Sequence, residues 1–488
     1  MRPFKIAPVF IVGAAVVGWA MPGALAQGIE FGPTESAPKP AQRKPAVQHL
    51  APGAGTAKPA NSPAAAANAR VGTATQELVA DNTSRGATSI PPAPSATYTT
   101  RGIPPPPKPA NCKNSESFDT FLARFRKQAA SAGISPATIR SALDGRTLDT
   151  GVIARDRKQG FFAQSFLDFS AKLATANRVT SGRAQIKKNA ETFARAARDY
   201  GVPASVITGF WALESDFGAG MGNLPIMNSL VTLAYDCRRG EMFQMELMAA
   251  LQIIDRGDMT PETMIGSWAG EIGQTQFLPT RYLEHAIDYD GDGRIDLFRN
   301  HADIIGSTAN YMMHLGWRPG EPWLEEVRVT KDLPWDQADL AIKLPRSQWV
   351  AWGVERIHGE PLENDRLPAS LLLPMGRYGP AFLAYENFNV YLQWNQSLNY
   401  AITAAWLATR IDGAPPMQKP SREIAVLSME EAKELQRLLV KRGFDVGEID
   451  GKVGAQTRAA VKSVQMELGF PADSFPTPDL IRAMRGAS

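Results

Sequence analysis

The sequence predicts a mainly α-helical protein with a minor β element and a small helical domain at its C-terminal end. Apolar residues recur at the spacing of a helix face along most of residues 118–411. Between residues 324 and 385 this pattern gives way to short runs typical of strands, and a linker-like segment at 413–425 precedes a last helical unit. A chain of 488 residues that is 44% hydrophobic and 21% charged has room for such a multidomain globular protein.

Residues 1–26 are predicted to be a secretory signal. Arg2 and Lys5 precede a short apolar run, which is followed by the small residues of a cleavage site ending near Ala26. The alternative is a transmembrane anchor, but the apolar run is short for a membrane span. Because no cysteine follows the run, a lipid anchor is not expected either, and we expect no stable membrane attachment.

Residues 27–110 are rich in Pro and Ala, poor in aromatic residues, and end in IPPPPKPA. Such a segment cannot bury enough apolar surface to fold, so we expect a disordered linker that is extended at its Pro-rich end. The formal net charge of the chain is only +3, which gives no reason to expect a nucleic-acid partner.

Helical periodicity defines a main domain at residues 111–412. Helices are expected at 118–135 (with a second helix starting at Ser135-Pro136), 161–177, 183–201, 241–257, 303–316 and 397–411. Short strands are expected at 323–330 and 366–374, in a smaller lobe.

The segment GFWALESDFG, residues 209–218, reads as the end of an amphipathic helix with Glu214 on the same face as Phe210 and Trp211. A carboxyl group held among aromatic side chains is desolvated, so its pKa is expected to rise and it can act as a general acid. Glycoside cleavage needs such an acid. The alternative is a Glu at a helix end that faces solvent or pairs with a Lys. Asp216, two residues on, points to another side of the helix and is a poor catalytic partner.

Residues 266–280 combine a Gly-rich turn with amide and hydroxyl side chains. The glycines allow close approach of the backbone. Ser267, Gln274, Gln276 and Thr280 supply neutral donors and acceptors of the kind that recognise sugar hydroxyl and N-acetyl groups.

Three stretches in the order ALESDFGAGMGNLPIMNSLVTLAYDCRRGEMF, SWAGEIGQTQFLPTRY and DYDGDGRIDL resemble the lytic murein transglycosylase B family, glycoside hydrolase family 103. The resemblance covers residues 115–412. It implies a lysozyme-like, α-rich catalytic domain that cleaves the MurNAc–GlcNAc β-1,4 bond of peptidoglycan without water. The product is a 1,6-anhydro-MurNAc end, and the expected location is the periplasm.

The resemblance implies roles for particular residues. Glu214 matches the single catalytic acid/base, and no cofactor is required for the chemistry. Residues that match substrate contacts are Ser267, Gln276 and Asn395 in the glycan cleft, Tyr400 as a nearby aromatic, and Arg239 at the peptide stem. Met242 and Trp394 depart from the family pattern, with an aromatic residue and a Tyr, respectively, being usual there.

Two other functions remain open from the sequence. A hydrolytic muramidase on the same scaffold would leave reducing ends, and a non-catalytic wall-binding protein would not need Glu214. We expect peptidoglycan glycan strands as the partner in each case, and a monomer.

The loop DYDGDGRIDLFR fits most of an EF-hand. Its candidate ligands for a structural Ca²⁺ are Asp288, Asp290, Asp292, the carbonyl of Arg294, and Asp296, with Gly293 at the turn position. Arg299 stands where a bidentate Glu is usual, so we expect weak binding; Asp303 is a possible source of a further oxygen. The alternative is an Asp/Gly-rich turn without metal. The family carries a calcium loop at this point.

The chain has two cysteines, Cys112 and Cys237, which an exported protein can join in a disulfide; two unpaired buried thiols are the alternative. The five histidines have no metal-binding spacing and are expected to be structural.

Residues 426–488 contain two helical patterns around the turn GEIDGKVGAQT. This unit resembles the peptidoglycan-binding domain type 1, which implies a small three-helix domain that anchors the enzyme to the wall. The alternative is a generic helical cap.

Overall fold

The computed structural model of the protein describes residue 108 and residues 111–158 and 164–486. The predicted signal at 1–26 lies outside the described residues, as does the predicted linker at 27–110 apart from Lys108. Within the described ranges, each helix is too short or too polar to cross a membrane.

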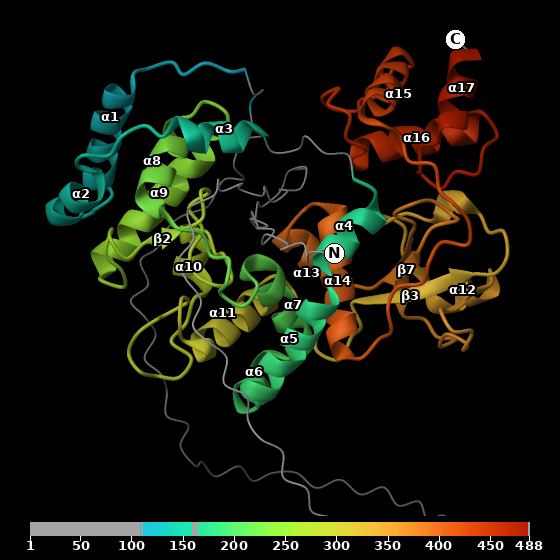
Figure 1. Ribbon diagram of the computed structural model, residues 1–488, viewed down its shortest axis with the longest axis horizontal. Helices are drawn as coiled ribbons and strands as arrows, with labels where there is room; N and C mark the ends of the chain where they lie inside the picture. Colours follow the sequence, from blue (N-terminus) through green and yellow to red (C-terminus); the bar gives the residue numbers. More distant parts are fainter. Residues whose placement is uncertain (1–107, 109–110, 159–163, 487–488) are drawn as a thin grey trace, which may run out of the picture. The chain divides into compact units, whose positions relative to one another are not determined.

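The main domain is built mostly from helices, as the sequence predicts (Figure 1). They are α1 (Phe118–Ser131), α2 (Pro136–Leu143), α3 (Thr150–Lys158), α4 (Phe166–Leu173), α5 (Ala176–Lys188), α6 (Ala190–Tyr200), α7 (Ala204–Ser215), α8 (Ile226–Tyr235), α9 (Gly240–Arg256), α10 (Pro279–His285), α11 (His301–His314), α13 (Phe388–Trp394) and α14 (Leu398–Asp412). Several begin where a hydroxyl accepts a hydrogen bond from the first turn, as at Ser117, Ser135 and Ser397.

The single helical segment expected at 183–201 is divided into α5 and α6 at Asn189. Its φ of −112° and ψ of 33° leave the helical region, and its side-chain Nδ2 donates to the carbonyl of Gln185 at 2.9 Å. Asn interrupts helices in this way because its side chain competes for backbone hydrogen bonds. The segment expected at 161–177 is likewise shorter, since α4 covers only Phe166–Leu173 and residues 161–163 lie outside the described residues.

Helix α7 is the central element of the domain. The prediction that this helix is amphipathic is wrong. Residues Ser205–Ser215 are all buried, because α7 packs against α5, α6, α11 and α14 (Figure 1). A helix that is apolar on all sides belongs in the core of a domain. The helix also ends earlier than Gly218, since Asp216 already has a φ of 50°.

The smaller lobe is an antiparallel sheet in the order β4-β6-β7-β3-β5, and the strands expected at 323–330 and 366–374 are confirmed as β3 and β6. The strands are β3 (Leu324–Val329), β4 (Leu344–Pro345), β5 (Val354–Arg356), β6 (Pro368–Leu372) and β7 (Ala381–Ala384), with helix α12 (Arg346–Ala351) beside them. Pairs such as Leu324 with Ala384 set the register. Two further short strands, β1 (Leu224–Pro225) and β2 (Ile265–Gly266), pair near the end of α7.

The C-terminal domain has the expected three helices, α15 (Met429–Lys441), α16 (Ala455–Glu467) and α17 (Pro478–Gly486). Leu435, Val461 and Leu480 are among the residues of its own apolar core. Arg458 of α16 is half-buried and donates to the carbonyl of Leu373, at 2.8 Å, at the end of β6. This domain is therefore bonded to the sheet as well as being joined by the chain.

Candidate active site

Glu214 lies in the last turn of α7 and is only 1% exposed. Packing on all sides of this helix removes the carboxyl group from water. The position also places it at the negative end of the helix dipole, which disfavours a negative charge. Burial and position together suit a carboxyl group that starts a reaction with its proton on.

Two donors from the C-terminal part of the domain converge on one oxygen of Glu214. Trp394 at the end of α13 donates from Nε1 to Oε1 at 2.9 Å, and the hydroxyl of Tyr400 in α14 donates to the same atom. Both bonds are buried, so the orientation of the carboxyl group is set by the packing of α13 and α14 against α7. The sequence analysis assigned Tyr400 to the glycan cleft as a nearby aromatic residue; it identified Trp394 only as a departure from the family pattern.

An aromatic wall surrounds this pair of bonds. The Trp394 ring lies 4.3 Å from Phe210, 5.2 Å from Tyr311 and 5.8 Å from Phe277, measured between ring centroids. Burial raises the pKa of the Tyr400 hydroxyl well above its usual value, and the charge of Glu214 raises it further. Tyr400 therefore stays a hydrogen-bond donor across the working pH range.

The turn after α7 is strained. Of the four non-glycine residues with positive φ in the described chain, three lie at this site: Asp216 (50°), Phe217 (59°) and Gln276 (50°). Such strain is typical of functional sites. Asp216 points away from the acid to pair with Arg178, at 3.3 Å, as expected for a residue that takes no part in the chemistry.

The polar segment 266–277 is bonded to α7 and to the turn that follows it. Gln274 accepts a 2.7 Å bond from Nε1 of Trp211, and Gln276 donates to the carbonyl of Met221 at 3.4 Å. Ser267 and Gln276 are 5% and 3% exposed. Both side chains are therefore part of the packed interior rather than of a free loop.

Glu271 in this segment is a second buried carboxyl group, and sequence reasoning gave it no role. It is 0% exposed and accepts a 2.8 Å hydrogen bond from Ser267. Burial raises its pKa well above the usual value, and the negative charge of Glu214 adds to the rise. The signal in the sequence was a lone acid between apolar and glycine residues in WAGEIG, which is rarely buried without a reason.

Asn395 and Arg239 lie in different parts of the domain. Asn395 follows Trp394 directly, is 8% exposed, and accepts from the backbone N–H of Ser397 at 2.9 Å. Arg239 begins α9 and pairs with the buried Asp156; burial lowers its pKa, although Asp156 opposes this. Its charge also acts on Glu271.

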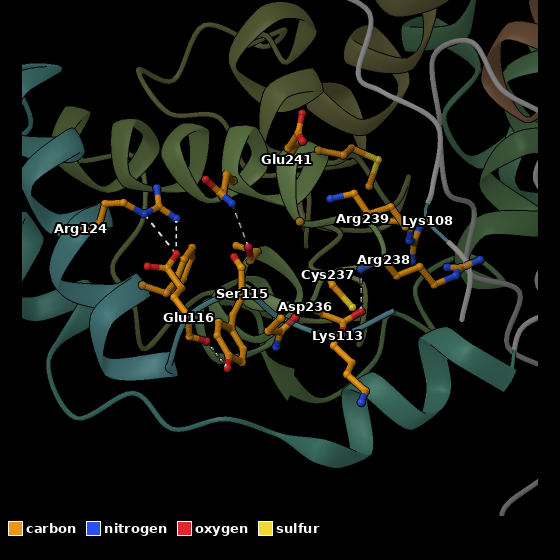
Figure 2. Close-up of a pocket in the computed structure, with 17 residues that line it drawn as sticks. Lys108, Lys113, Ser115, Glu116, Arg124, Asp236, Cys237, Arg238, Arg239 and Glu241 are labelled. Atoms are coloured by element: carbon orange, nitrogen blue, oxygen red, sulfur yellow. Dashed lines mark hydrogen bonds and ion pairs between the residues drawn. The ribbon is translucent and has the colours of Figure 1, made fainter. Parts of the chain in front are cut away.

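Arg239 lines a cavity of about 230 Å³ between α1, α9 and the segment before α1 (Figure 2). Lys108, Lys113 and Arg238 line the same cavity. Glu116, Asp236 and Glu241 line it as well, so the lining carries charges of both signs, and the cations among them are groups that can receive an anion.

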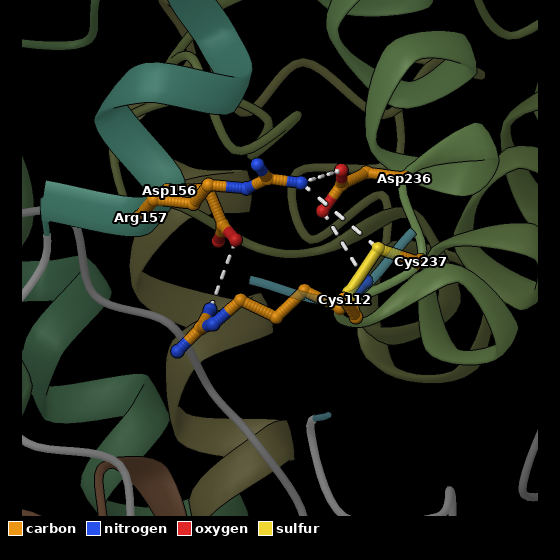
Figure 3. The surroundings of a disulfide bond; sticks show 6 residues. Cys112, Asp156, Arg157, Asp236 and Cys237 are labelled. Carbon is orange, nitrogen blue, oxygen red and sulfur yellow. Dashed lines mark hydrogen bonds and ion pairs between the residues drawn. A yellow bond between two sulfur atoms is a disulfide. The ribbon is translucent and has the colours of Figure 1, made fainter. Parts of the chain in front are cut away.

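Cys112 and Cys237 form a disulfide across a sequence separation of 125, with Cα atoms 6.0 Å apart (Figure 3). Ion pairs surround it: Arg157 contacts Asp236 at 2.7 Å, and Arg238 contacts Asp156 at 2.9 Å. The bridge fixes the segment before α1 to the loop that carries Arg239.

The acidic loop places only part of the predicted ligand set together. Oxygens of Asp288, Asp290 and Asp303 lie within 4.8 Å of one another. Asp292 and Asp296 lie outside this group of three, and their carboxylates accept from backbone N–H groups of the loop at 2.8–3.0 Å. Asp303 in α11 also accepts from the backbone N–H groups of Tyr289 and Asp296, which links the loop to the helix. These three carboxylates suit Ca²⁺, which prefers oxygen ligands.

Comparison with known proteins identifies relatives for both folded parts. The Transglycosylase SLT domain family matches residues 117–409, and the Putative peptidoglycan binding domain family matches residues 428–484. Membrane-bound lytic murein transglycosylase B of Escherichia coli K12 is 31% identical over 243 residues, which cover 50% of this chain and 66% of that protein. The chain therefore matches just under two thirds of the length of this curated relative.

Solved structures agree with these matches. SltB3 from Pseudomonas aeruginosa in complex with NAG-anhNAM-pentapeptide is 39% identical with a TM-score of 0.71, covering 76% of this chain and 100% of that chain. Escherichia coli Slt35 in complex with calcium is 28% identical with a TM-score of 0.52, covering 60% of this chain and 92% of that chain. The likeness confirms the mainly α fold class predicted from the sequence.

Proposed function

The chain belongs to the transglycosylase SLT family, and on that premise we propose that it is a peptidoglycan lytic transglycosylase. It has the lysozyme-like fold of its relatives. It cleaves the β-1,4 bond between MurNAc and GlcNAc without water and leaves a 1,6-anhydro-MurNAc end. The observation that carries this proposal is Glu214, a carboxyl group 1% exposed at a helix end and held by two donors on one oxygen.

Glu214 acts twice in this reaction. Its proton passes to the glycosidic oxygen as the bond from that oxygen to the anomeric carbon breaks, and the N-acetyl oxygen of MurNAc stabilises the electron-poor carbon. The Glu214 carboxylate then takes the proton of the C6 hydroxyl as the C6 oxygen bonds to the anomeric carbon. Glu214 regains in the second step the proton that it gave up in the first, so the chemistry needs neither a cofactor nor a water molecule.

Other residues serve the substrate. We assign Ser267, Gln276, Asn395 and Tyr400 to the glycan cleft. In support of this, Tyr400 donates to Glu214, Asn395 follows Trp394 directly, Ser267 bonds to Glu271, and Gln276 bonds to Met221 in the turn after α7. Arg239 and the other cations of its cavity suit a carboxylate of the peptide stem; the SltB3 complexes with pentapeptide-bearing ligands support this assignment.

The remaining assignments follow from the same proposal. The C-terminal domain binds peptidoglycan and raises the local substrate concentration. The enzyme works as an exported, periplasmic protein. Asp288, Asp290 and Asp303 would hold a structural Ca²⁺, which would join the acidic loop to α11 and take no part in the chemistry. The calcium complex of Slt35 supports this site.

Digestion of purified sacculi, followed by mass spectrometry of the released muropeptides, tests the proposal. We expect 1,6-anhydro-MurNAc ends from the wild-type chain, and a loss of about 10²–10⁴-fold in rate for Glu214→Gln, because general acid–base catalysis contributes that much. Reducing MurNAc ends alone would identify a hydrolytic muramidase. Undiminished lysis by Glu214→Gln would contradict the assignment of the acid.

A further inference from the structure

Glu271 is a buried acid that the proposed mechanism leaves unused. Its Oε2 accepts the hydroxyl hydrogen of Ser267 at 2.8 Å, and that hydroxyl in turn accepts from the backbone N–H groups of Ala269 and Glu271. Its Oε1 is buried and has no hydrogen-bond partner among the described residues. An acid in such a place is costly to ionise, so its presence calls for a functional reason.

The segment that carries Glu271 is fixed against the end of α7. Gly266 pairs with Leu224 in the short β1–β2 ladder, and Leu224 follows Glu214 by ten residues in the chain. Gln274 and Gln276 bond to Trp211 and Met221 on either side of Glu214 in the chain. A side chain at Gly266 would come within 2.3 Å of the Glu271 carbonyl oxygen, so this close turn requires glycine. The segment that carries Glu271 is therefore packed closely and bonded to α7, the helix that carries Glu214.

Two charged groups act on Glu271, one of each sign. Burial raises the pKa of Glu271 most, and Glu214 of α7 raises it further, while Ser267 and Arg239 at the start of α9 lower it. Tyr400 of α14 is affected by both acids, since the charge of each raises its pKa. Glu214 and Glu271 thus belong to one electrostatic cluster, with Arg239 as its positive member.

We propose that Glu271 is a positioning residue for the proton of Glu214, and that the two buried carboxyl groups hold a single proton between them near neutral pH. This inference rests on the proposed function, since it explains how one Glu serves as both acid and base. The charge of Glu214 acts on the buried Glu271, and two negative charges in one buried cluster repel each other, so the pair keeps one proton.

The pairing suits both steps of the reaction. The form of the pair that starts the reaction has the proton on Glu214 and the negative charge on Glu271, where Ser267 donates to it and the charge of Arg239 acts against the rise in the pKa of Glu271. After Glu214 has given up its proton, the neighbouring negative charge makes its carboxylate a stronger base toward the C6 hydroxyl. Glu271 itself exchanges no bond with the substrate.

Glu271→Gln tests the pairing by its pH profile. The amide keeps the size of the side chain and can still accept from Ser267, but it removes the charge. We expect the alkaline limb of kcat/KM to move to lower pH by about one unit or more, because Glu214 loses its proton more easily without the second charge. Glu271→Asp keeps the charge and should leave the limb near its wild-type position even if kcat falls.

Glu326→Gln is the matched control. Glu326 is also a buried acid, 6% exposed, but it lies in β3 of the sheet, and the alkaline limb should not move in this variant. An unshifted limb in Glu271→Gln would count against the pairing, because a purely structural role would lower kcat without moving the profile.

A second measurement needs no turnover. In protein labelled with ¹³C at the Glu carboxyl groups, the resonance missing from Glu271→Gln identifies Glu271, and its titration is followed in the wild type and in Glu214→Gln. We expect a lower midpoint for Glu271 in Glu214→Gln, by about one unit or more. The same midpoint in both would overturn the inference. If Glu271→Gln fails to fold, site-specific labelling can assign the Glu271 resonance in its place. The titration does not depend on which product the enzyme makes.

Discussion

The indole N–H of Trp394 donates a 2.9 Å hydrogen bond to Glu214 across a separation of 180 residues. This bond joins the end of α13 to the end of α7, so the acid is oriented by a helix from the far end of the same domain. Tyr400 donates to the same oxygen, Oε1, from the start of α14. With Oε1 held by two donors, the proton that Glu214 gives up belongs on Oε2.

Tyr400→Phe should slow the reaction without unfolding the protein. The ring is kept, but the ionised form of Glu214 loses a charge-assisted hydrogen bond worth about 1.5–3 kcal/mol. We expect kcat to fall about ten- to a hundredfold and the alkaline limb of the pH profile to move to higher pH, since Glu214 then holds its proton more tightly. Steady-state rates on purified sacculi across pH check both.

Tyr391→Phe is the control for this prediction. Tyr391 is as buried as Tyr400, but its hydroxyl has no hydrogen-bond partner among the described residues. Its removal should leave the pH profile where it is. Equal effects of the two variants would show that the Tyr400 hydroxyl acts through packing alone.

Replacing both Cys112 and Cys237 by Ala should lower the free energy of unfolding by about 2–5 kcal/mol. The bridge closes a loop with a sequence separation of 125, so its loss frees a large part of the unfolded chain. Urea unfolding with and without a thiol reductant measures this: the wild type should lose stability in reductant and the double variant should not. A wild type unaffected by complete reduction would contradict the expectation.

Ca²⁺ should raise the melting temperature, and Asp303→Asn should abolish the rise. Asp303 brings a buried carboxylate from α11 to Asp288 and Asp290, so its loss removes a ligand and the link to the helix. At a free Ca²⁺ concentration a hundredfold above Kd, the stabilisation amounts to about 2.7 kcal/mol.

Asp296→Asn separates this ligand set from the one predicted by EF-hand spacing. The Asp296 side chain accepts from Phe298 and Arg299 and lies outside the cluster, so this variant should keep the Ca²⁺ response. Loss of the response in Asp296→Asn but not in Asp303→Asn would favour the spacing over the structure.

The sequence predicted what local patterns and motifs encode. Helical periodicity located most helices, strand composition located β3 and β6, and the position of Glu214 among aromatic residues indicated a shielded acid. What it missed depends on contacts across the chain. The Trp394–Glu214 bond and the burial of Glu271 both depend on residues that no local period relates. The amphipathic α7 was wrong for the same reason, because neighbours on every side appear only once the domain is folded.

Glu326 makes the stability of the sheet depend on pH. Burial is the main cause that raises its pKa, to about 7, against the opposing effects of the Gln418 N–H and Arg410. The folded state therefore binds this proton more tightly than the unfolded chain, whose Glu has its usual value near 4.5. The stability that this proton contributes is complete below about pH 4.5 and is lost as the pH rises through 7. Between pH 5 and 7.5 the wild type should lose about 2 kcal/mol more than Glu326→Gln, in which the side chain does not titrate. Urea unfolding of both proteins at the two pH values measures the difference, and parallel losses would show that Glu326 keeps its usual pKa in the fold.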